Sequence, residues 1–246
     1  MSLNFLTLLV IGAMCGGFIN GLAGFGTALF ALGWWLQIMS PVEAVAMVLV
    51  LAVVSGAQGM LVIWNSINWG KLAKFLVPAL FGIPVGWKLL SWFEPFFLKM
   101  LIACFLIAYG GLFLFRKNLP QLQTQRPLVD GFIGFSGGVL GSFAGLSGAL
   151  PTMWAALHPW AKDQQRALLQ PFNIFVLGLS ALLLAYNGAY TKAVLINLGI
   201  AVPVSLASAY LGILIYGRLK DAQFRRLMIG LMFLSGLTLI LREILV

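Results

Sequence analysis

Long apolar runs, separated by short polar breaks, dominate the pattern along the chain. Runs such as residues 45–54 and 100–115 lack the alternation of apolar and polar positions that membrane β-strands show. Six stretches have roughly the twenty residues that a membrane-spanning helix needs. These stretches are residues 42–63, 75–93, 96–115, 167–186, 193–216 and 224–241. The pattern therefore predicts an all-α polytopic membrane protein.

Two further stretches, residues 3–39 and 128–157, are too long for one span and too short for two. As a single helix the first would be about 55 Å long at 1.5 Å per residue, against a hydrocarbon core of about 30 Å. A glycine-rich segment interrupts each stretch: NGLAGFG at residues 20–26 and GSFAGLSG at residues 141–148. We expect each stretch to form a helical hairpin that breaks at its glycines.

The two interrupted stretches resemble one another. With a shift of 121 residues, GGFINGLAGFGTAL (residues 16–29) aligns without a gap to GGVLGSFAGLSGAL (residues 137–150), with six identical positions. Both segments interrupt their stretches at corresponding points. The sequence therefore predicts an internal duplication.

Basic residues distinguish two topologies. If each over-long stretch crosses the membrane once, the Lys and Arg residues divide seven against eight between the two sides. If each stretch instead returns to the side it entered, eleven of the fifteen collect on one side, as expected of a cytoplasmic face. These eleven are Lys71, Lys74, Arg116, Lys117, Arg126, Lys162, Arg166, Arg218, Lys220, Arg225 and Arg226. The hairpin topology is favoured.

The hairpin topology makes the two halves inverted repeats, because each half contains one hairpin and an odd number of spans. We expect a first repeat at residues 1–118, a cytoplasmic linker at 119–126 and a second repeat at 127–246, with both termini periplasmic. The hairpin tips should meet near the membrane midplane. Inverted repeats with glycine-broken helices are a recurring plan of secondary transporters, and the breaks mark the substrate site.

The composition agrees with a membrane protein. Hydrophobic residues make up 61% of the chain and charged residues 9%, and the mean hydropathy is +1.02. The net charge of +9 resides in short breaks between spans, which indicates loops at an anionic membrane surface rather than a nucleic-acid interface. Cys15 and Cys104 have no partner at metal-ligand spacing, and His158 is the single histidine. We expect no metal, no cofactor and no enzyme activity.

At its glycine breaks the sequence resembles the TauE/SafE family, also called the toluene-sulfonate uptake permease family. The resemblance rests on NGLAGFGTALFAL, on GSFAGLSGALPTMW and on the following RALLQPFN, and it extends over essentially the whole chain. Membership implies a bacterial inner-membrane carrier for sulfur-containing anions such as sulfite, sulfoacetate or another organosulfonate. The second break lacks the asparagine of the first, so any role of Asn20 is asymmetric between the halves.

The residues around the two breaks are candidates for substrate binding. A broken helix frees N–H groups at the start of its returning half, and these donors, with the positive end of the helix dipole, favour an anion. The candidates at the breaks are Asn20, Gly24, Gly26, Thr27, Ser142, Gly145, Ser147 and Gly148. The alternative is that these small residues only permit close helix packing.

Three further candidates belong to the span that follows the second hairpin. Gln170 and Asn173 lie three residues apart, on one helical face around Pro171, and amides in a membrane should point inward. They either contact the substrate or join helices. Arg166 either gives the anion a cationic contact near the cytoplasmic mouth or is an ordinary cytoplasmic loop charge.

The carboxylates all lie near span ends, so the sequence gives no support for proton coupling. The candidate functions that remain are a carrier with alternating access, an anion channel, a carrier for non-sulfur organic anions and a non-transporting scaffold. The partners are a small anion and the lipid bilayer. The coupling ion, the direction of transport and the oligomeric state, a homodimer included, stay open.

Overall fold

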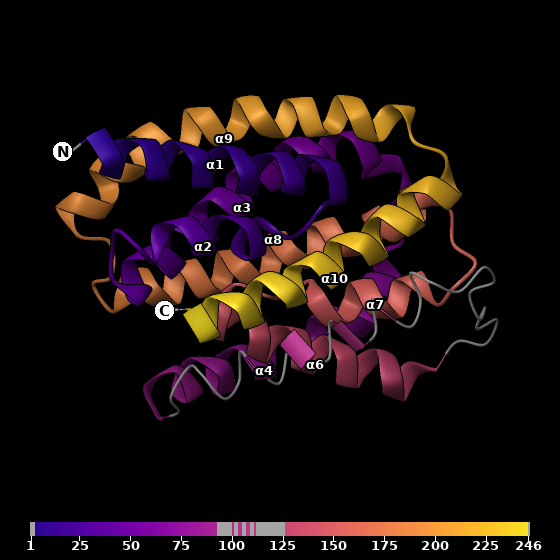
Figure 1. Ribbon diagram of the computed structural model, residues 1–246. Helices are drawn as coiled ribbons and strands as arrows, with labels where there is room; N and C mark the ends of the chain where they lie inside the picture. Colours follow the sequence, from indigo (N-terminus) through magenta and orange to yellow (C-terminus); the bar gives the residue numbers. More distant parts are fainter. Residues whose placement is uncertain are drawn as a thin grey trace.

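The computed structural model describes residues 3–92 and 126–245, together with Met100, Ala103, Cys104, Ile107, Ala108 and Gly111. This part of the chain consists of helices and short connections (Figure 1). The helices are α1 (Leu3–Ala23), α2 (Thr27–Trp35), α3 (Pro41–Ile63), η1 (Trp64–Ser66), α4 (Trp69–Trp92), α6 (Pro127–Ala144), α7 (Ala149–Ala156), α8 (Lys162–Tyr186), α9 (Lys192–Arg218) and α10 (Asp221–Leu245). Within the described residues, six helices are long and apolar enough to cross a membrane: α1, α3, α4, α6, α8 and α9. The predicted all-α, multi-pass membrane fold is confirmed.

The predicted spans correspond to α3, α4, α8, α9 and α10, and the largest differences are at the starts of α4 and α8. Helices α4 and α8 begin at Trp69 and Lys162, several residues before the predicted starts at 75 and 167. Lys162, the first residue of α8, donates from its Nζ to the carbonyls of Tyr216 and Leu219 at the end of α9. The predicted span 96–115 and the linker 119–126 lie almost wholly outside the described residues.

A helix, a break and a short returning helix occupy both predicted hairpin positions. Thr27, the first residue of α2, faces Gly16 of α1, whereas Trp35 at the end of α2 donates its indole N–H to the carbonyl of Leu9, 3.1 Å away. Later residues of α2 therefore meet earlier residues of α1, so the two helices are antiparallel.

The second pair has the same arrangement. Ser147 lies against Gly141 of α6, and Trp154 of α7 donates its indole N–H to Asp130 Oδ1, 2.7 Å away. The arms of both hairpins are unequal. Helices α1 and α6 have 21 and 18 residues, against 9 and 8 for α2 and α7. At 1.5 Å per residue α1 is about 31 Å long, so only the returning arms are half-helices.

Glycines bring α1 against α9 at backbone contact distance. A Cβ added at Gly21 would lie 2.0 Å from the carbonyl oxygen of Ala209, and one at Gly17 would lie 2.4 Å from that of Ser205. The numbers of the contacting residues rise in the same direction along both helices, so α1 and α9 are parallel. Contacts this close allow backbone packing in lipid, where no hydrophobic force drives helices together.

Helices α4 and α6 pack in the same way. A Cβ at Gly134 would lie 2.2 Å from the carbonyl oxygen of Phe75, and one at Gly138 would lie 2.4 Å from that of Ala79. These helices are also parallel. Figure 1 shows the α1–α9 pair and the α4–α6 pair on either side of α3 and α8.

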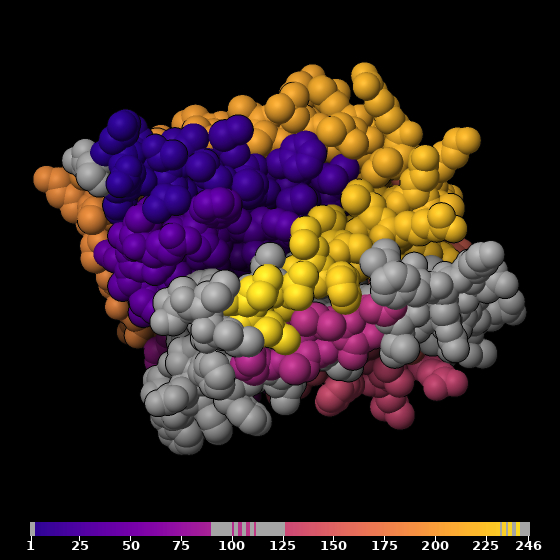
Figure 2. Space-filling view, in the orientation of Figure 1, coloured from indigo at the N-terminus to yellow at the C-terminus, as the bar shows by residue number. Residues whose placement is uncertain are grey.

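Helices α3 and α8 pack together at the centre in opposite directions. Gly59 of α3 lies against Arg166 of α8, and Gly56, a turn earlier, lies against Gln170 and Ile174. The α3 helix starts at a capping box in which Ser40 and Glu43 bond reciprocally, so Glu43 serves as a cap. Helix α10 contacts both short helices, α2 and α7, and Figure 2 shows it in yellow beside the indigo and violet N-terminal helices.

We expect Gly138→Val to disrupt the α4–α6 contact, because its Cβ would meet the Ala79 backbone, which cannot move aside as a flexible side chain could. Overpacking of this kind costs about 1–3 kcal/mol or more. The thermal unfolding temperature of the purified protein should fall clearly. The matched control is Gly199→Val in α9, where nothing lies within 4 Å. Equal unfolding temperatures for the two variants would contradict the close α4–α6 packing.

Candidate functional site

Glycines with positive φ end the long arm of each hairpin. Gly24 and Gly26 have φ values of 82° and 98°, and Gly145 has a φ value of 70°. Such values are left-handed conformations that L side chains rarely adopt, so glycine is required at these positions. At the end of α6 the N–H groups of Gly145 and Leu146 donate back to the carbonyls of Gly141 and Leu140. These two carbonyls are therefore satisfied within the turn.

The two breaks meet at Asn173 of α8. The Asn173 Nδ2 donates to the carbonyl of Gly24, 2.9 Å away, and its Oδ1 accepts from the hydroxyl of Ser147, 2.6 Å away. Phe25 and Gly148 also touch, since a Cβ at Gly148 would lie 2.8 Å from the Cβ of Phe25. One amide side chain thus joins the two hairpin tips, which come from segments about 120 residues apart.

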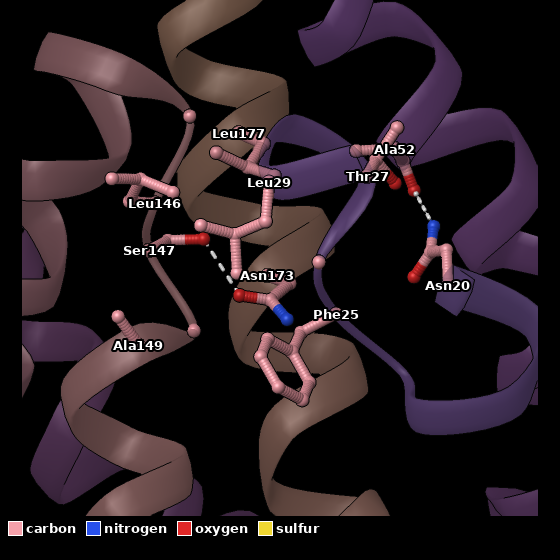
Figure 3. A pocket seen from close by; sticks show the side chains of 13 residues that line it. Asn20, Phe25, Thr27, Leu29, Ala52, Leu146, Ser147, Ala149, Asn173 and Leu177 are labelled. Atoms are coloured by element: carbon pink, nitrogen blue, oxygen red, sulfur yellow. Dashed lines mark hydrogen bonds between the residues drawn. The ribbon is translucent and has the colours of Figure 1, made fainter. Parts of the chain in front are cut away.

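A small pocket lies where the tips meet (Figure 3). Its lining residues are Asn20, Phe25, Gly26, Thr27, Leu29, Ala52, Gly145, Leu146, Ser147, Gly148, Ala149, Asn173 and Leu177. The volume open to the centres of water-sized molecules is about 10 Å³, which is room for about one water. The lining contains amide, hydroxyl and apolar groups and no carboxylate.

Helices α2 and α7 both begin at this pocket, and neither has a side-chain cap. Their N-cap residues are Gly26 and Gly148. The N–H groups of a first helical turn have no acceptor within the helix, and they lie at its positive end. In α7 the N–H of Ala149 turns back to the carbonyl of Leu146, 3.2 Å away. The remaining first-turn N–H groups are suited to bind an anion.

Thr27 adds an unpartnered hydroxyl to the pocket. The residue is 2% exposed and opens α2, and its Oγ1 has no hydrogen-bond partner among the described residues. A buried hydroxyl without a partner is unfavourable by about 1–3 kcal/mol. The site therefore has one polar group that a bound ligand would satisfy.

Asn20 lines the pocket and also joins two helices. Its Nδ2 donates to the carbonyl of Ala52 in α3, 3.0 Å away, and to the hydroxyl of Ser55, 2.6 Å away. Figure 3 shows the Asn20–Ala52 bond on the side of the pocket opposite Ser147. The amide N–H groups are thus engaged within the protein.

Gln170 and Arg166 are buried near the pocket but do not line it. Gln170 donates from Nε2 to the carbonyl of Gly56, 2.9 Å away, and accepts at Oε1 from Arg166 Nε, 3.0 Å away. Arg166 is 0% exposed and donates from Nη2 to the carbonyl of Gly21 at the end of α1, 2.7 Å away. The interpretation of Arg166 as an exposed loop charge is wrong, because α1 and α9 cover it.

Ser142 is the one candidate at the breaks that faces away from the pocket. Its hydroxyl donates to the carbonyl of Ile83 in α4, 2.8 Å away. Ser142 therefore holds α6 against α4. Gly24 also stays outside the lining, but its carbonyl is bound by Asn173 next to the pocket.

Several lining residues were missed because they are apolar. Leu177 lies one turn after Asn173 in α8, and Ala52 lies 121 residues before Asn173, which is the offset between the two breaks. One helical turn after Asn173 leads to Leu177, and the repeat offset of 121 residues leads back from Asn173 to Ala52. These two signals in the sequence would have identified both residues. Phe25 and Leu146 lie inside the breaks themselves. Among the described residues, no group of three or more His, Cys, Asp or Glu side chains could hold a metal ion.

We expect Asn173→Ala to separate the hairpin tips, because it leaves the Gly24 carbonyl and the Ser147 hydroxyl without their shared partner. Unpairing a buried polar group costs about 1–3 kcal/mol. Thermal unfolding should therefore occur at a lower temperature than in the unmodified protein. Asn187→Ala is the control, since Asn187 is exposed at the end of α8. If the two variants lose the same stability, Asn173 does not join the tips.

Comparison with known proteins identifies one family. The family model described as "Sulfite exporter TauE/SafE" matches residues 8–239, which is nearly the whole chain. No curated protein and no solved structure matches the chain. The match agrees with the resemblance of the glycine breaks.

Proposed function

The chain belongs to the sulfite exporter TauE/SafE family, and from this premise we propose that it is a secondary transporter for a small sulfur-containing anion. Sulfite, sulfoacetate and other organosulfonates are the substrate class, and the membrane is a bacterial inner membrane. The observation that carries the proposal is the pocket at which α2 and α7 both begin, with the buried Thr27 hydroxyl unpartnered beside it.

The chemistry of the pocket favours an oxyanion over a cation or a neutral solute. First-turn N–H groups of two helices, with their positive dipole ends, supply donors that converge from the two hairpins. Thr27 adds a free hydroxyl group that can donate to an oxygen atom, and the Ser147 hydroxyl can do so once it turns away from Asn173 Oδ1. Because no carboxylate lines the pocket, a cation would find no counter-charge there. In our proposal the anion binds against Gly26 and Thr27 on one side and Gly145, Ser147 and Gly148 on the other.

The narrowness of the pocket supports a carrier rather than a channel. The space in the pocket that the centre of a water molecule can occupy is about 10 Å³, and a pocket this narrow is too small for a pyramidal sulfur oxyanion. The hairpin tips must therefore move apart for the anion to enter, on one side or the other. A channel would instead need a continuous wide path. This closed geometry supports alternating access around the two tips.

Helix directions support the proposal that the two halves are inverted repeats. Helices α1 and α9 are parallel, helices α4 and α6 are parallel, and helices α3 and α8 are antiparallel. A two-fold rotation that exchanges the halves places α1 on α6 and α9 on α4, so the α1–α9 pair becomes the α6–α4 pair. The same rotation exchanges α3 and α8, which stay in contact with each other. Helix α6 then runs opposite to α1, so the two hairpins enter from opposite membrane faces.

The distribution of basic residues supports a cytoplasmic assignment for one end of the molecule. Lys71, Lys162 and Lys220 all lie at the end where α4, α8 and α10 begin, whereas Lys88 and Lys192 lie toward the opposite end. The positive-inside rule makes the basic end cytoplasmic. Both termini would then be periplasmic, since α1 begins and α10 ends away from the basic end (Figure 1).

We expect purified protein in liposomes to carry sulfite in a saturable way, with counterflow stimulation. Thr27→Val and Ser147→Ala should each weaken sulfite binding about tenfold or more, because a hydrogen bond to a charged group contributes about 1.5–3 kcal/mol. Sulfite titrations and flux assays measure this loss. The control is Thr7→Val, since Thr7 is exposed on α1 and bonds only to its own helix.

Unchanged sulfite affinity in both pocket variants would show that the pocket is misplaced. Flux that is not saturable would favour an anion channel. Preference for plain carboxylates over sulfur oxyanions would replace the substrate class with non-sulfur organic anions.

Labelling of single cysteines tests the topology, in a background carrying Cys15→Ala and Cys104→Ala. Gln37→Cys, after α2, should react with a membrane-impermeant maleimide in intact cells, because it lies at the periplasmic end. Gln223→Cys, in the first turn of α10, should react only after permeabilisation. Both native glutamines are exposed in the structure. The reverse pattern of labelling would invert the assignment of the two faces.

A further inference from the structure

Arg166 is a buried cation whose Nη1 N–H groups have no acceptor among the described residues. Its guanidinium bonds through Nη2 to the Gly21 carbonyl and through Nε to Gln170 Oε1, and it lies 4.2 Å from the ring centre of Tyr216. The residue is 0% exposed, and Nη1 has no hydrogen-bond partner among the described residues. A fully buried guanidinium therefore holds an unsatisfied N–H group.

The guanidinium of Arg166 also makes no direct ion pair among the described residues, although the Asp163 carboxylate acts on its charge from one turn away. The contacts of its guanidinium are a carbonyl, an amide and an aromatic ring. Asp163, one turn earlier on α8, instead accepts a hydrogen bond from the Tyr216 hydroxyl. In the part of the chain that the structure describes, no carboxylate lies within 4 Å of the Arg166 nitrogens. A buried unpaired charge in a membrane protein is costly and points to a function.

The surroundings of Arg166 are shaped to hold its side chain. A Cβ at Gly59 of α3 would lie 2.5 Å from Nη2, and a Cβ at Gly24 would lie 3.3 Å from the Arg166 Cγ. Both positions are glycine, so α3 and the first hairpin leave space for the side chain. Helices α1, α3, α8 and α9 all contribute to the enclosure. Arg166 is therefore part of the protein interior and not a surface charge.

Arg166 lies in line with the pocket between the hairpin tips. Arg166, Gln170 and Asn173 share one face of α8, and Asn173 lines the pocket. Seven residues separate Arg166 from Asn173, a rise of roughly 10 Å along the helix. Arg166 is on the side of the pocket nearer the basic end of the molecule, where α8 begins. Arg166 therefore lies between that end and the level of the pocket along α8.

We propose that Arg166 forms a second anion subsite, separate from the pocket between the hairpin tips. The proposal rests on the proposed function, because it takes the same class of small sulfur oxyanion. An oxygen atom of the anion bonds to Nη1 and supplies a counter-charge in direct contact, which the described residues do not provide. The carrier then holds an anion at two positions on its path, one at Arg166 and one between α2 and α7.

The test is sulfite titration of the full-length purified protein by calorimetry, with sulfate and chloride as further probes. The unmodified protein should bind two sulfite ions per chain, and Arg166→Gln should bind one. Arg218→Gln is the matched control, because Arg218 is exposed at the end of α9 and its loss removes the same charge. Arg218→Gln should still bind two ions.

A second variant tests the subsite without altering Arg166, in case Arg166→Gln does not fold. The double substitution Thr27→Val with Ser147→Ala weakens the pocket, and one sulfite per chain should still bind at Arg166. No binding in that variant, or unchanged stoichiometry in folded Arg166→Gln, overturns the subsite and leaves the proposed function standing. An unmodified protein that binds none of the three anions overturns both proposals.

Discussion

A helix that begins inside a membrane leaves peptide N–H groups that no water can satisfy, and the rest of the structure is organised around two such helix starts. Helices α2 and α7 begin at Gly26 and Gly148 without a side-chain cap, and both ends face one buried pocket. In lipid these donors need protein acceptors or a ligand. An anion is the ligand that satisfies both the unpaired donors and the positive dipole ends. Binding and the arrangement of the helices thus depend on the same constraint.

The packing of the long helices keeps the two ends together. Glycines at the α1–α9 and α4–α6 contacts let backbones touch, so each long hairpin arm is fixed against a span of the other half of the chain. Helix α8 then joins the parts through its amide side chains, since Asn173 contacts both tips and Gln170 contacts α3. Both tips therefore contact the same helix.

The main features of the fold could be predicted from the sequence, since hydropathy and glycine placement are local signals. The over-long stretches and their glycines predicted both breaks, and Gly24, Gly26 and Gly145 do adopt positive φ. The unequal arms could not be predicted, because hydropathy does not reveal where in an apolar run a helix turns back. The role of each half in an inverted repeat, and the binding role of every candidate, stay predictions.

Ser142 and Arg166 lie outside the pocket for a common physical reason. Ser142 was grouped with the pocket because it is a small hydroxyl residue within a break, yet its acceptor is Ile83 of a distant helix. The burial of Arg166 depends on Gly21 and Tyr216, which approach only after the whole bundle has formed. Contacts between residues so far apart in the chain leave no trace in local composition. The repeat offset was the one long-range signal in the sequence, and it would have pointed from Asn173 to Ala52.

The central claim is that two half-helices from different parts of the chain share one anion. Anomalous diffraction from crystals soaked with selenite, the selenium analogue of sulfite, tests it most directly. We expect a selenium peak between the starts of α2 and α7, within hydrogen-bond distance of Thr27 or Ser147. Ordered selenium elsewhere in the protein, with none between those two helix ends, would contradict it.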